Sequence, residues 1–229
     1  MKKEILVISL GGSLIVPDKI DIKFLKEFKK LILKHIKTKQ FYIITGGGST
    51  ARKYAKAAGK IDNIDSDDRD WLGIHCTRLN GHLLKIIFKK HTYSRVVKNP
   101  NKKIKTSKPI IIAAGYKPGC SSDLDAVQIA KSVGAKTVLN LSNINYVYDK
   151  DPKKYKNARK IKKATWKEFR KIIPKKWKYG MHAPFDPVAS RAAQKLKLKV
   201  VIMNGKKLKQ VSNFLHKQPF EGTIIQDGK

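Results

Sequence analysis

Cysteines, acidic residues and long apolar runs are all scarce in this sequence, and each scarcity excludes a class of protein. Only two of the 229 residues are cysteines, Cys76 and Cys120, and they form no C-x-x-C pair. A disulfide framework or a structural zinc site is therefore not expected, and each cysteine is explained as a small buried thiol. No apolar run is long enough to span a bilayer, and the first residues lead directly into a strand-like segment. We expect a cytoplasmic protein without a membrane partner.

The shortage of acidic residues leaves a large positive charge. The chain has 17 Asp and Glu residues against 51 Lys and Arg residues, which gives a formal net charge of +34. Such an excess would suit a protein that binds a polyanion such as nucleic acid. The lysines are spread over every expected helix, however, and do not form one arm or one stripe. We therefore favour a lysine-biased surface over a nucleic-acid-binding one.

The stretch from 149 to 178 is the least regular part of the chain. It mixes lysine runs with Tyr155, Trp166, Phe169 and Trp177. Aromatic side chains among basic ones can stack on nucleic-acid bases. We favour the simpler interpretation, in which they anchor a long loop or helix to the body of the protein.

Apolar runs typical of buried strands alternate with helical patterns along nearly the whole length. The strand-like runs lie at 5–8, 41–44, 110–113, 137–141, 200–203 and 222–225. Helical spacing of apolar residues occurs around 24–32, 49–58, 72–84, 121–133 and 188–196. Repeated strand–helix units of this kind predict one α/β domain, a three-layer αβα sandwich with a mainly parallel sheet.

Two glycine-rich turns directly follow the first two strands. Gly46-Gly47-Gly48 leads into a helix that we expect Ser49 or Thr50 to open, with Arg52 one turn further on. Glycines let the backbone approach a ligand closely, and free N–H groups at a helix start attract phosphate. The turn Gly11-Gly12-Ser13 is weaker evidence alone. Because the carboxyl ends of parallel strands meet at one edge of a sheet, the two turns are expected to face each other and to serve two phosphate groups.

Two further loops complete this edge. The loop from Gly115 to Asp123 ends in Ser121 and Ser122, which are good helix N-caps, so an anionic group could dock there. Asp123 is either an ordinary acid of a first helical turn or the group that organises charges near a transferred phosphate. We leave out Asp125, because two residues further along a helix a side chain points elsewhere.

The fourth loop, from 140 to 153, follows another strand. It carries polar and aromatic side chains that would suit a nucleoside. An adenine could rest on Tyr148 while Ser142 or Asp151 fixes the rest of the nucleotide.

Taken in this order, the motifs resemble those of the amino acid kinase family, and within it the archaeal-type uridylate (UMP) kinases. They are GGS at 11–13, TGGGSTAR at 45–52, DWLGIHCTRLN at 70–80, PGCSSD at 118–123 and YVYDKDPK at 146–153. The resemblance extends from about residue 5 to residue 193. It implies transfer of the γ-phosphoryl group of ATP, with Mg²⁺, to UMP in pyrimidine nucleotide biosynthesis. It also implies a homo-oligomer, usually a hexamer, built from one domain with an acceptor part at roughly 1–125 and an ATP part at roughly 126–229.

The resemblance also assigns roles to individual residues. It implies an ATP site formed by Ser9, Gly11, Gly12, Ser13, Gly48, Arg52, Ser142, Tyr148 and Asp151. It implies a UMP site formed by Gly47, Asp70, Tyr116, Lys117, Pro118, Gly119, Cys120, Ser121 and Ser122. Arg52 and Asp123 would be the catalytic residues, and no protein side chain is assigned to a metal.

Three departures from the family pattern keep alternatives open. Ser9 stands where many members carry a lysine. The acceptor loop has Ser121 and Ser122 before its aspartate, where relatives often have threonines. The segment from Gly180 to Pro187 resembles the Gly-Met segment of other branches, but the lysine that follows there is missing. The alternatives are another acceptor, such as a carboxylate or an alkyl phosphate, or a relative that binds nucleotides or other anions without catalysis. Isopentenyl phosphate kinases usually have a histidine where this chain has Thr45, which argues against that acceptor.

Overall fold

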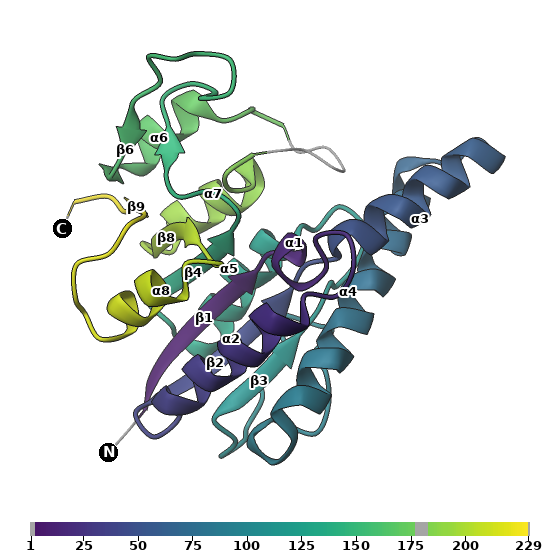
Figure 1. Cartoon of the computed structure of the whole chain (residues 1–229), viewed down its shortest axis with the longest axis vertical. Helices are drawn as coiled ribbons and strands as arrows, with labels where there is room; N and C mark the ends of the chain where they lie inside the picture. The colour runs from purple at the N-terminus through teal and green to yellow at the C-terminus, as the bar shows by residue number, and fades with distance from the viewer. Residues whose placement is uncertain (1–2, 177–182, 229) are drawn as a thin grey trace.

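A computed structural model describes residues 3–176 and 183–228, and its centre is a seven-stranded sheet (Figure 1). The strands in spatial order are β3 (Ile110–Ala113), β2 (Lys39–Thr45), β1 (Glu4–Leu10), β4 (Thr137–Ser142), β8 (Lys199–Asn204), β9 (Thr223–Ile225) and β7 (Lys163–Ala164). The first five strands in this order run parallel, and only the β8–β9 pair is antiparallel. A separate hairpin pairs β5 (Val147–Tyr148) with β6 (Lys160–Ile161).

Side chains alternate between the two faces of the sheet, and each face is covered by helices. On β1, Leu6, Ile8 and Leu10 belong to one apolar core and Val7 to the other, as the two-residue period of a strand requires. The first core contains residues of α2 (Ile22–His35), α4 (Ser66–Phe88) and α8 (Leu208–Leu215). The second contains residues of α5 (Ser122–Val133), α6 (Trp166–Ile172) and α7 (Pro187–Lys195). The predicted αβα sandwich with a mainly parallel sheet is therefore confirmed.

The remaining helices lie near the glycine turns or at the end of α4. The short α1 (Gly12–Ile15) follows β1, and α3 (Gly48–Ile61) follows β2 and packs along α4. Figure 1 shows α3 reaching outward at one side of the molecule. A single 3₁₀ turn, η1 (Lys89–His91), follows α4. Within the described ranges no helix has both the length and the apolar character needed to cross a membrane.

The lysine-rich stretch from 149 to 178 has more structure than its sequence suggests. It contains β6, β7 and α6, and a capping box between Thr165 and Glu168 begins α6. Trp166 and Phe169 are fully buried, so the interpretation of these two as anchors is confirmed. Tyr155 is exposed and does not anchor the loop, while Trp177 lies outside the described residues. The helix α8 was also missed, since it has only 8 residues and is recognisable only from its packing on α2.

Candidate functional site

The two glycine turns touch each other at the carboxyl edge of the sheet. β1 and β2 pair in parallel with Leu10 beside Thr45, so both chains leave the sheet at the same level. A Cβ atom placed on Gly12 would lie 2.0 Å from the backbone nitrogen of Gly48, and one on Gly46 would lie 2.4 Å from that of Gly12. Only glycines permit this approach. The expectation that the turns face each other is therefore confirmed.

The start of α3 differs from the expected one. Gly47 is the N-cap and Gly48, with a φ of 70°, is the first helical residue, so neither Ser49 nor Thr50 opens the helix. Ser49 is buried, and its Oγ donates to the Asp18 carbonyl at 2.9 Å. The Gly46 N–H donates to the Leu10 carbonyl and the Ser49 N–H to the Val16 carbonyl, both at 2.9 Å. The N–H groups of Gly47 and Gly48 have no such backbone acceptor in the described structure, which suits a phosphate. Arg52 is exposed one turn further on, and Ser13 lies on α1.

Asn80 holds the second turn in place and was missed by the sequence interpretation. Its Nδ2 donates to the carbonyls of Gly46 at 2.8 Å and Gly47 at 3.3 Å, and the residue is buried. An asparagine on the inner side of a long helix is a weak sequence signal. Only the position of α4 against the turn reveals its role.

Asp123 lies at the centre of a hydrogen-bond network beside these turns. Its Oδ1 accepts from Ser9 Oγ at 3.0 Å and from Asn140 Nδ2 at 2.8 Å, while its Oδ2 accepts from the Asp186 backbone N–H at 3.2 Å. Burial, and the neighbouring charge of Asp186, raise the pKa of Asp123 to about 6, against the effect of the Ser9 hydrogen bond. Asn140 and Asp186 were not predicted. Ser9, where many family members carry a lysine, supplies a hydroxyl donor and no cation.

The loop from Gly115 to Ser122 is held from beneath by α4. The Gly119 N–H donates to Asp70 Oδ2 at 2.7 Å, and Arg78 donates to the carbonyls of Gly115 and Tyr116 at 3.3 and 3.0 Å. Burial raises the pKa of Asp70, although the Gly119 bond opposes this. Asp70 and the loop, which lie far apart in the sequence, are thus brought together as expected.

The other members of this loop are at its surface or at the start of α5. Ser121 caps α5 by accepting from the Leu124 N–H at 3.1 Å, and Ser122 is its first residue. Lys117 is exposed, with its ammonium group 5.6 Å from the centre of the Tyr116 ring. Pro118 and Cys120 are half-buried, and burial raises the pKa of the Cys120 thiol.

The expectation that Asp125 points away from the site is wrong. Asp125 is 1% exposed, its Oδ2 accepts from the Tyr116 N–H at 3.1 Å, and its Oδ1 is buried without a partner in the described structure. Helix geometry separates Asp123 from Asp125 correctly, but the loop folds back over α5 and meets the second carboxylate. Burial raises the pKa of Asp125 to about 7, with the Tyr116 bond and the charge of Arg78 acting in the opposite direction.

This buried carboxylate should make stability depend on pH. In the unfolded chain Asp125 ionises near its usual pKa of 3.8, whereas in the folded chain it ionises near 7, so folding loses stability as pH rises between these values. Asp125→Asn removes this loss. From pH 4 to pH 8, the variant should gain on the order of 4 kcal/mol in unfolding free energy relative to wild type. Urea unfolding at several pH values measures the difference.

Asp67→Asn provides the matched control, because Asp67 is exposed in the first turn of α4. The control should have a pH profile of stability close to that of the wild type. Parallel profiles for Asp125→Asn and wild type would contradict the prediction.

The three residues that were expected to bind ATP beyond its phosphates lie at different distances from the glycine turns. Ser142 ends β4 beside Gly11, whose Cβ would lie 3.6 Å from the Ser142 Cα. Tyr148 lies in the β5–β6 hairpin and is half-buried. Asp151 is exposed, and its Oδ1 accepts from the Lys153 N–H at 2.9 Å, which closes a local turn. Only Ser142 is therefore in contact with the glycine turns.

The last segment singled out in the sequence is only partly visible. Residues 180–182 of the Gly-Met segment lie outside the described residues, while Asp186 caps α7 through the N–H groups of Val188 and Ala189. In the described ranges no cluster of three or more His, Cys, Asp or Glu side chains could hold a metal ion.

Thr45 has a structural role at the position where isopentenyl phosphate kinases usually carry a histidine. Its Oγ1 lies 2.8 Å from the Thr77 carbonyl and 3.3 Å from that of Ala113, and the side chain is completely buried. It joins β2 to α4 and β3 and leaves no acid–base group at this point.

Comparisons with known proteins agree with this arrangement. The sequence profile of the amino acid kinase family matches residues 4–204. A uridylate kinase of Sulfurisphaera tokodaii is 32% identical over 188 residues, covering 80% of this chain and 82% of the relative. A uridylate kinase of Pyrococcus abyssi is 30% identical over 224 residues, covering 96% and 99%.

A solved structure leads to the same conclusion. The uridylate kinase of Archaeoglobus fulgidus superimposes with a TM-score of 0.81 at 26% identity, covering 96% of this chain and 99% of the other. The family profile matches far more than half of the residues, and the relatives match over most of their length. Together with the paired glycine turns, these matches show that the chain belongs to the amino acid kinase family.

Proposed function

We propose that this chain is a UMP kinase, which transfers the γ-phosphoryl group of ATP to the phosphate of UMP. The backbone contact between the two glycine turns carries the proposal. It brings together at one edge of the sheet the N–H groups of Gly12, Gly47 and Gly48, for which the described structure has no backbone acceptor. The similarity to uridylate kinases over nearly the whole chain supports UMP as the acceptor.

The acceptor lies between Gly47, Asp70 and the loop from Tyr116 to Ser122. Asp70 is 7% exposed and already fixes the loop through Gly119, so a ribose hydroxyl bound to its carboxylate would be held by both. ATP lies on the side of Gly11, Gly12 and Ser142, with Ser13 and Gly48 near its phosphates. The outer hairpin with Tyr148 and Asp151 would reach the nucleoside end of ATP.

The reaction needs alignment and charge neutralisation more than acid–base chemistry. The UMP phosphate oxygen is already anionic, and it forms the new bond to the γ-phosphorus as the bond to the β–γ bridging oxygen breaks. Free N–H groups of the two turns and the guanidinium of Arg52 would neutralise the transferred group. Asp123 would keep Ser9, Asn140 and the start of α7 in position around it.

We include Mg²⁺ as the companion of ATP in this proposal. Mg²⁺ is usually held by substrate phosphates, water and one or two carboxylates, and therefore does not require a dedicated cluster of the kind that the described residues lack. Asp123 Oδ2 accepts one hydrogen bond and Oδ1 accepts two, so Oδ2 is the oxygen with a free lone pair. Bound there, the ion would neutralise charge on the ATP phosphates.

A coupled assay for ADP release tests the proposal. The purified chain should turn over UMP with ATP and Mg²⁺, and turnover with CMP, acetylglutamate or isopentenyl phosphate should be at least about a hundredfold slower in kcat/KM. Each alternative acceptor lacks either the uracil edge or the nucleoside that the loop would contact. Absence of UMP turnover, or faster turnover of one of the others, would reject UMP as the acceptor.

A nucleotide-binding relative without catalysis is the second candidate, and Ser9 is the observation that favours it. If this were the function, calorimetry would detect UMP and ATP binding without transfer, and Ser9→Lys would not restore transfer. A rise in turnover with Ser9→Lys would instead support the kinase and show that a cation at this position still fits the site.

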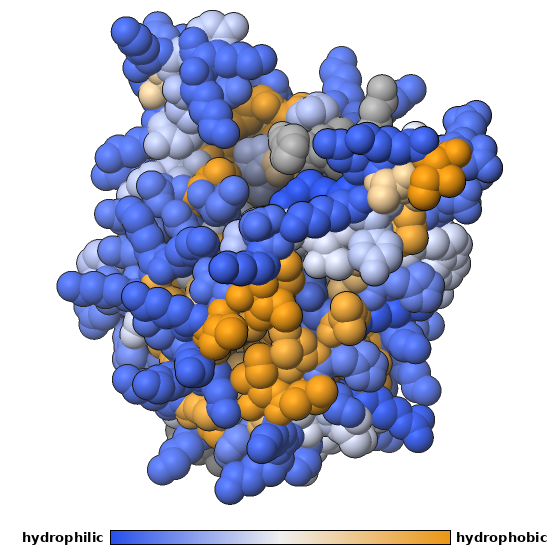
Figure 2. Space-filling model, turned by 45° about the vertical axis from the view of Figure 1, so that its right-hand side comes forward, coloured by the Kyte–Doolittle hydropathy of each residue, from blue (hydrophilic) through white to orange (hydrophobic). Residues whose placement is uncertain are grey.

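We also propose that the chain assembles with itself, as a hexamer by family resemblance. Apolar side chains gather on the face shown in Figure 2, and α4 carries the exposed Trp71, Leu79 and Ile86. Exposed apolar groups of this size commonly mark a protein interface. Sedimentation equilibrium should give six times the 25.9 kDa chain mass, and a monomer at micromolar concentration would contradict the proposal.

A further inference from the structure

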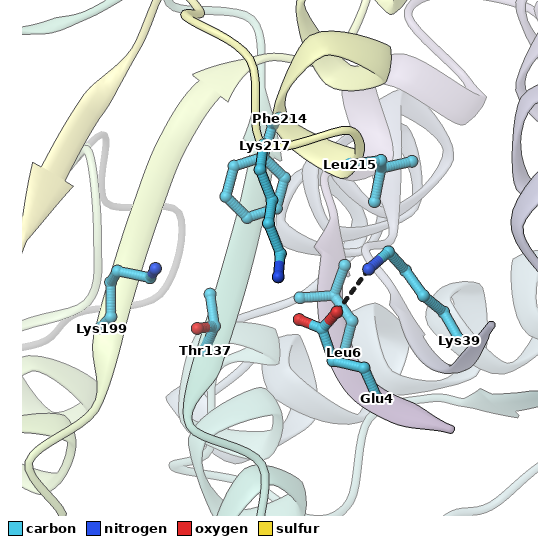
Figure 3. A pocket seen from close by; sticks show the side chains of 8 residues that line it. All are labelled: Glu4, Leu6, Lys39, Thr137, Lys199, Phe214, Leu215 and Lys217. Carbon is cyan, nitrogen blue, oxygen red and sulfur yellow. Dashed lines mark hydrogen bonds and ion pairs between the residues drawn. The ribbon is translucent and has the colours of Figure 1, made fainter. Parts of the chain in front are cut away.

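A small cavity lies at the edge of the sheet opposite to the glycine turns (Figure 3). Its volume is about 140 Å³, close to that of an engineered cavity that takes one benzene ring. Four parallel strands contribute residues near their amino-terminal ends, and the end of α8 closes the cavity. The residues that matter are Glu4, Lys39, Thr137, Lys199, Phe214 and Lys217.

The polar groups of this cavity carry a positive charge that is only partly compensated. Three lysines and one glutamate give a formal charge of +2. Lys39 is nine-tenths buried and forms an ion pair with Glu4. Within the described ranges, the ammonium groups of Lys199 and Lys217 form no ion pair, and Figure 3 shows both pointing into the cavity. The ammonium groups of Lys199 and Lys217 therefore point into a cavity whose one carboxylate, that of Glu4, is already paired with Lys39.

The backbone of Lys217 has a conformation that is unusual for a lysine. Lys217 has a φ of 60° and follows the last turn of α8, where its N–H donates to the Phe214 carbonyl at 3.0 Å. This left-handed position after a helix usually belongs to glycine or asparagine, since a larger side chain is strained there. The chain nevertheless has a lysine at this position, and its side chain points into the cavity (Figure 3).

We propose that this cavity binds a compact dianion of the phosphate type, either free phosphate or the phosphate group of a monoester. Such a group carries nearly two negative charges near neutral pH, which matches the two uncompensated ammonium groups. Lysine binds phosphate through charge-assisted hydrogen bonds, and the Thr137 hydroxyl offers a neutral donor beside them. The Phe214 ring lies on one side of the cavity, Lys199 is half-buried and Lys217 is exposed, so a dianion could reach both ammonium groups from solvent.

The cavity is separate from the nucleotide-binding edge. Glu4, Lys39, Thr137 and Lys199 begin β1, β2, β4 and β8, whereas the glycine turns follow the other ends of β1 and β2. An anion in the cavity would not compete with the nucleotides. Its binding does not depend on the proposed UMP kinase activity.

Isothermal titration of the whole chain with inorganic phosphate tests the proposal, at constant ionic strength adjusted with chloride. Lys199→Met and Lys217→Gly should each weaken one phosphate-binding event at least about tenfold. Lys217→Gly should remain folded, because glycine accepts the left-handed backbone. Titration with glycerol 3-phosphate separates the two sources: equal or tighter binding indicates a monoester, and loss of binding indicates free phosphate.

Lys197→Gly is the matched control. Lys197 also has a positive φ, 52°, and follows the end of α7, but it does not line the cavity. Its variant removes the same charge and should bind phosphate like the wild type. Equal affinity in all four proteins, or an equal loss in Lys197→Gly and Lys217→Gly, would overturn the proposal, because it would assign binding to the general lysine surface or to the glycine turns.

Discussion

Gly12→Ala should lose about 3 kcal/mol or more of stability and at least about a hundredfold in kcat/KM. The new Cβ would lie 2.0 Å from the Gly48 nitrogen and 2.7 Å from the Gly46 carbonyl carbon. Both neighbours are backbone atoms, so no rotation of a side chain relieves the clash. The two turns must separate, and separation misplaces the N–H groups proposed to hold the phosphates. Thermal unfolding and steady-state kinetics with UMP and ATP measure the two effects.

Gly59→Ala on α3 is the control, because the same methyl group meets only the tip of a flexible side chain. Its Cβ would lie 3.2 Å from an Arg69 guanidinium nitrogen, and alanine stabilises a helix interior by about 0.5–1 kcal/mol relative to glycine. Gly46→Ala disrupts the same backbone contact from the other turn. The double variant should therefore lose less unfolding free energy than the sum of the two single variants. A Gly12→Ala protein as stable and active as Gly59→Ala would show that the contact is not needed.

Asp123→Asn should reduce kcat about a hundredfold and stability by about 1–3 kcal/mol. The carboxylate accepts from Ser9, Asn140 and the Asp186 N–H, and all three groups are donors in this arrangement. An asparagine offers one acceptor oxygen, and its amide group would place a donor against a donor. Activity would fall further because the negative charge beside the transferred phosphate and its Mg²⁺ is lost.

The exchange Asp123→Asn with Asn140→Asp separates the hydrogen bond from the charge. The double variant restores a donor–acceptor pair between residues 123 and 140, 2.8 Å apart in the wild type, and moves the carboxylate to β4. We expect recovery of most of the lost stability without recovery of kcat. If kcat also returned to the wild-type value, the position of the charge would be irrelevant and Asp123 would have only a structural role.

Much of the fold could be predicted from local sequence patterns. The runs at 5–8, 41–44, 110–113 and 137–141 became β1, β2, β3 and β4 almost without change, because buried parallel strands are continuous apolar runs. The short elements β5, β6, β7 and α8 were missed. Their residues are kept in place by contacts with distant parts of the chain, such as the Thr223 hydroxyl bonded to the Val147 N–H at 2.8 Å.

In the candidate site, too, local sequence patterns predicted some features and long-range contacts decided the others. The sequence by itself determined that Gly12 and Gly46 lie in turns directly after two buried strands, and parallel pairing of those strands then brings the turns to one edge. Only the tertiary structure decided that Asn80, Asp125, Asn140 and Asp186 belong to the site, and that three lysines far apart in the chain share a cavity at the opposite edge. The physical reason is that a glycine turn is specified by its own backbone. A buried polar side chain instead takes its role from whichever donor or acceptor the packed helices and loops place within about 3 Å of it.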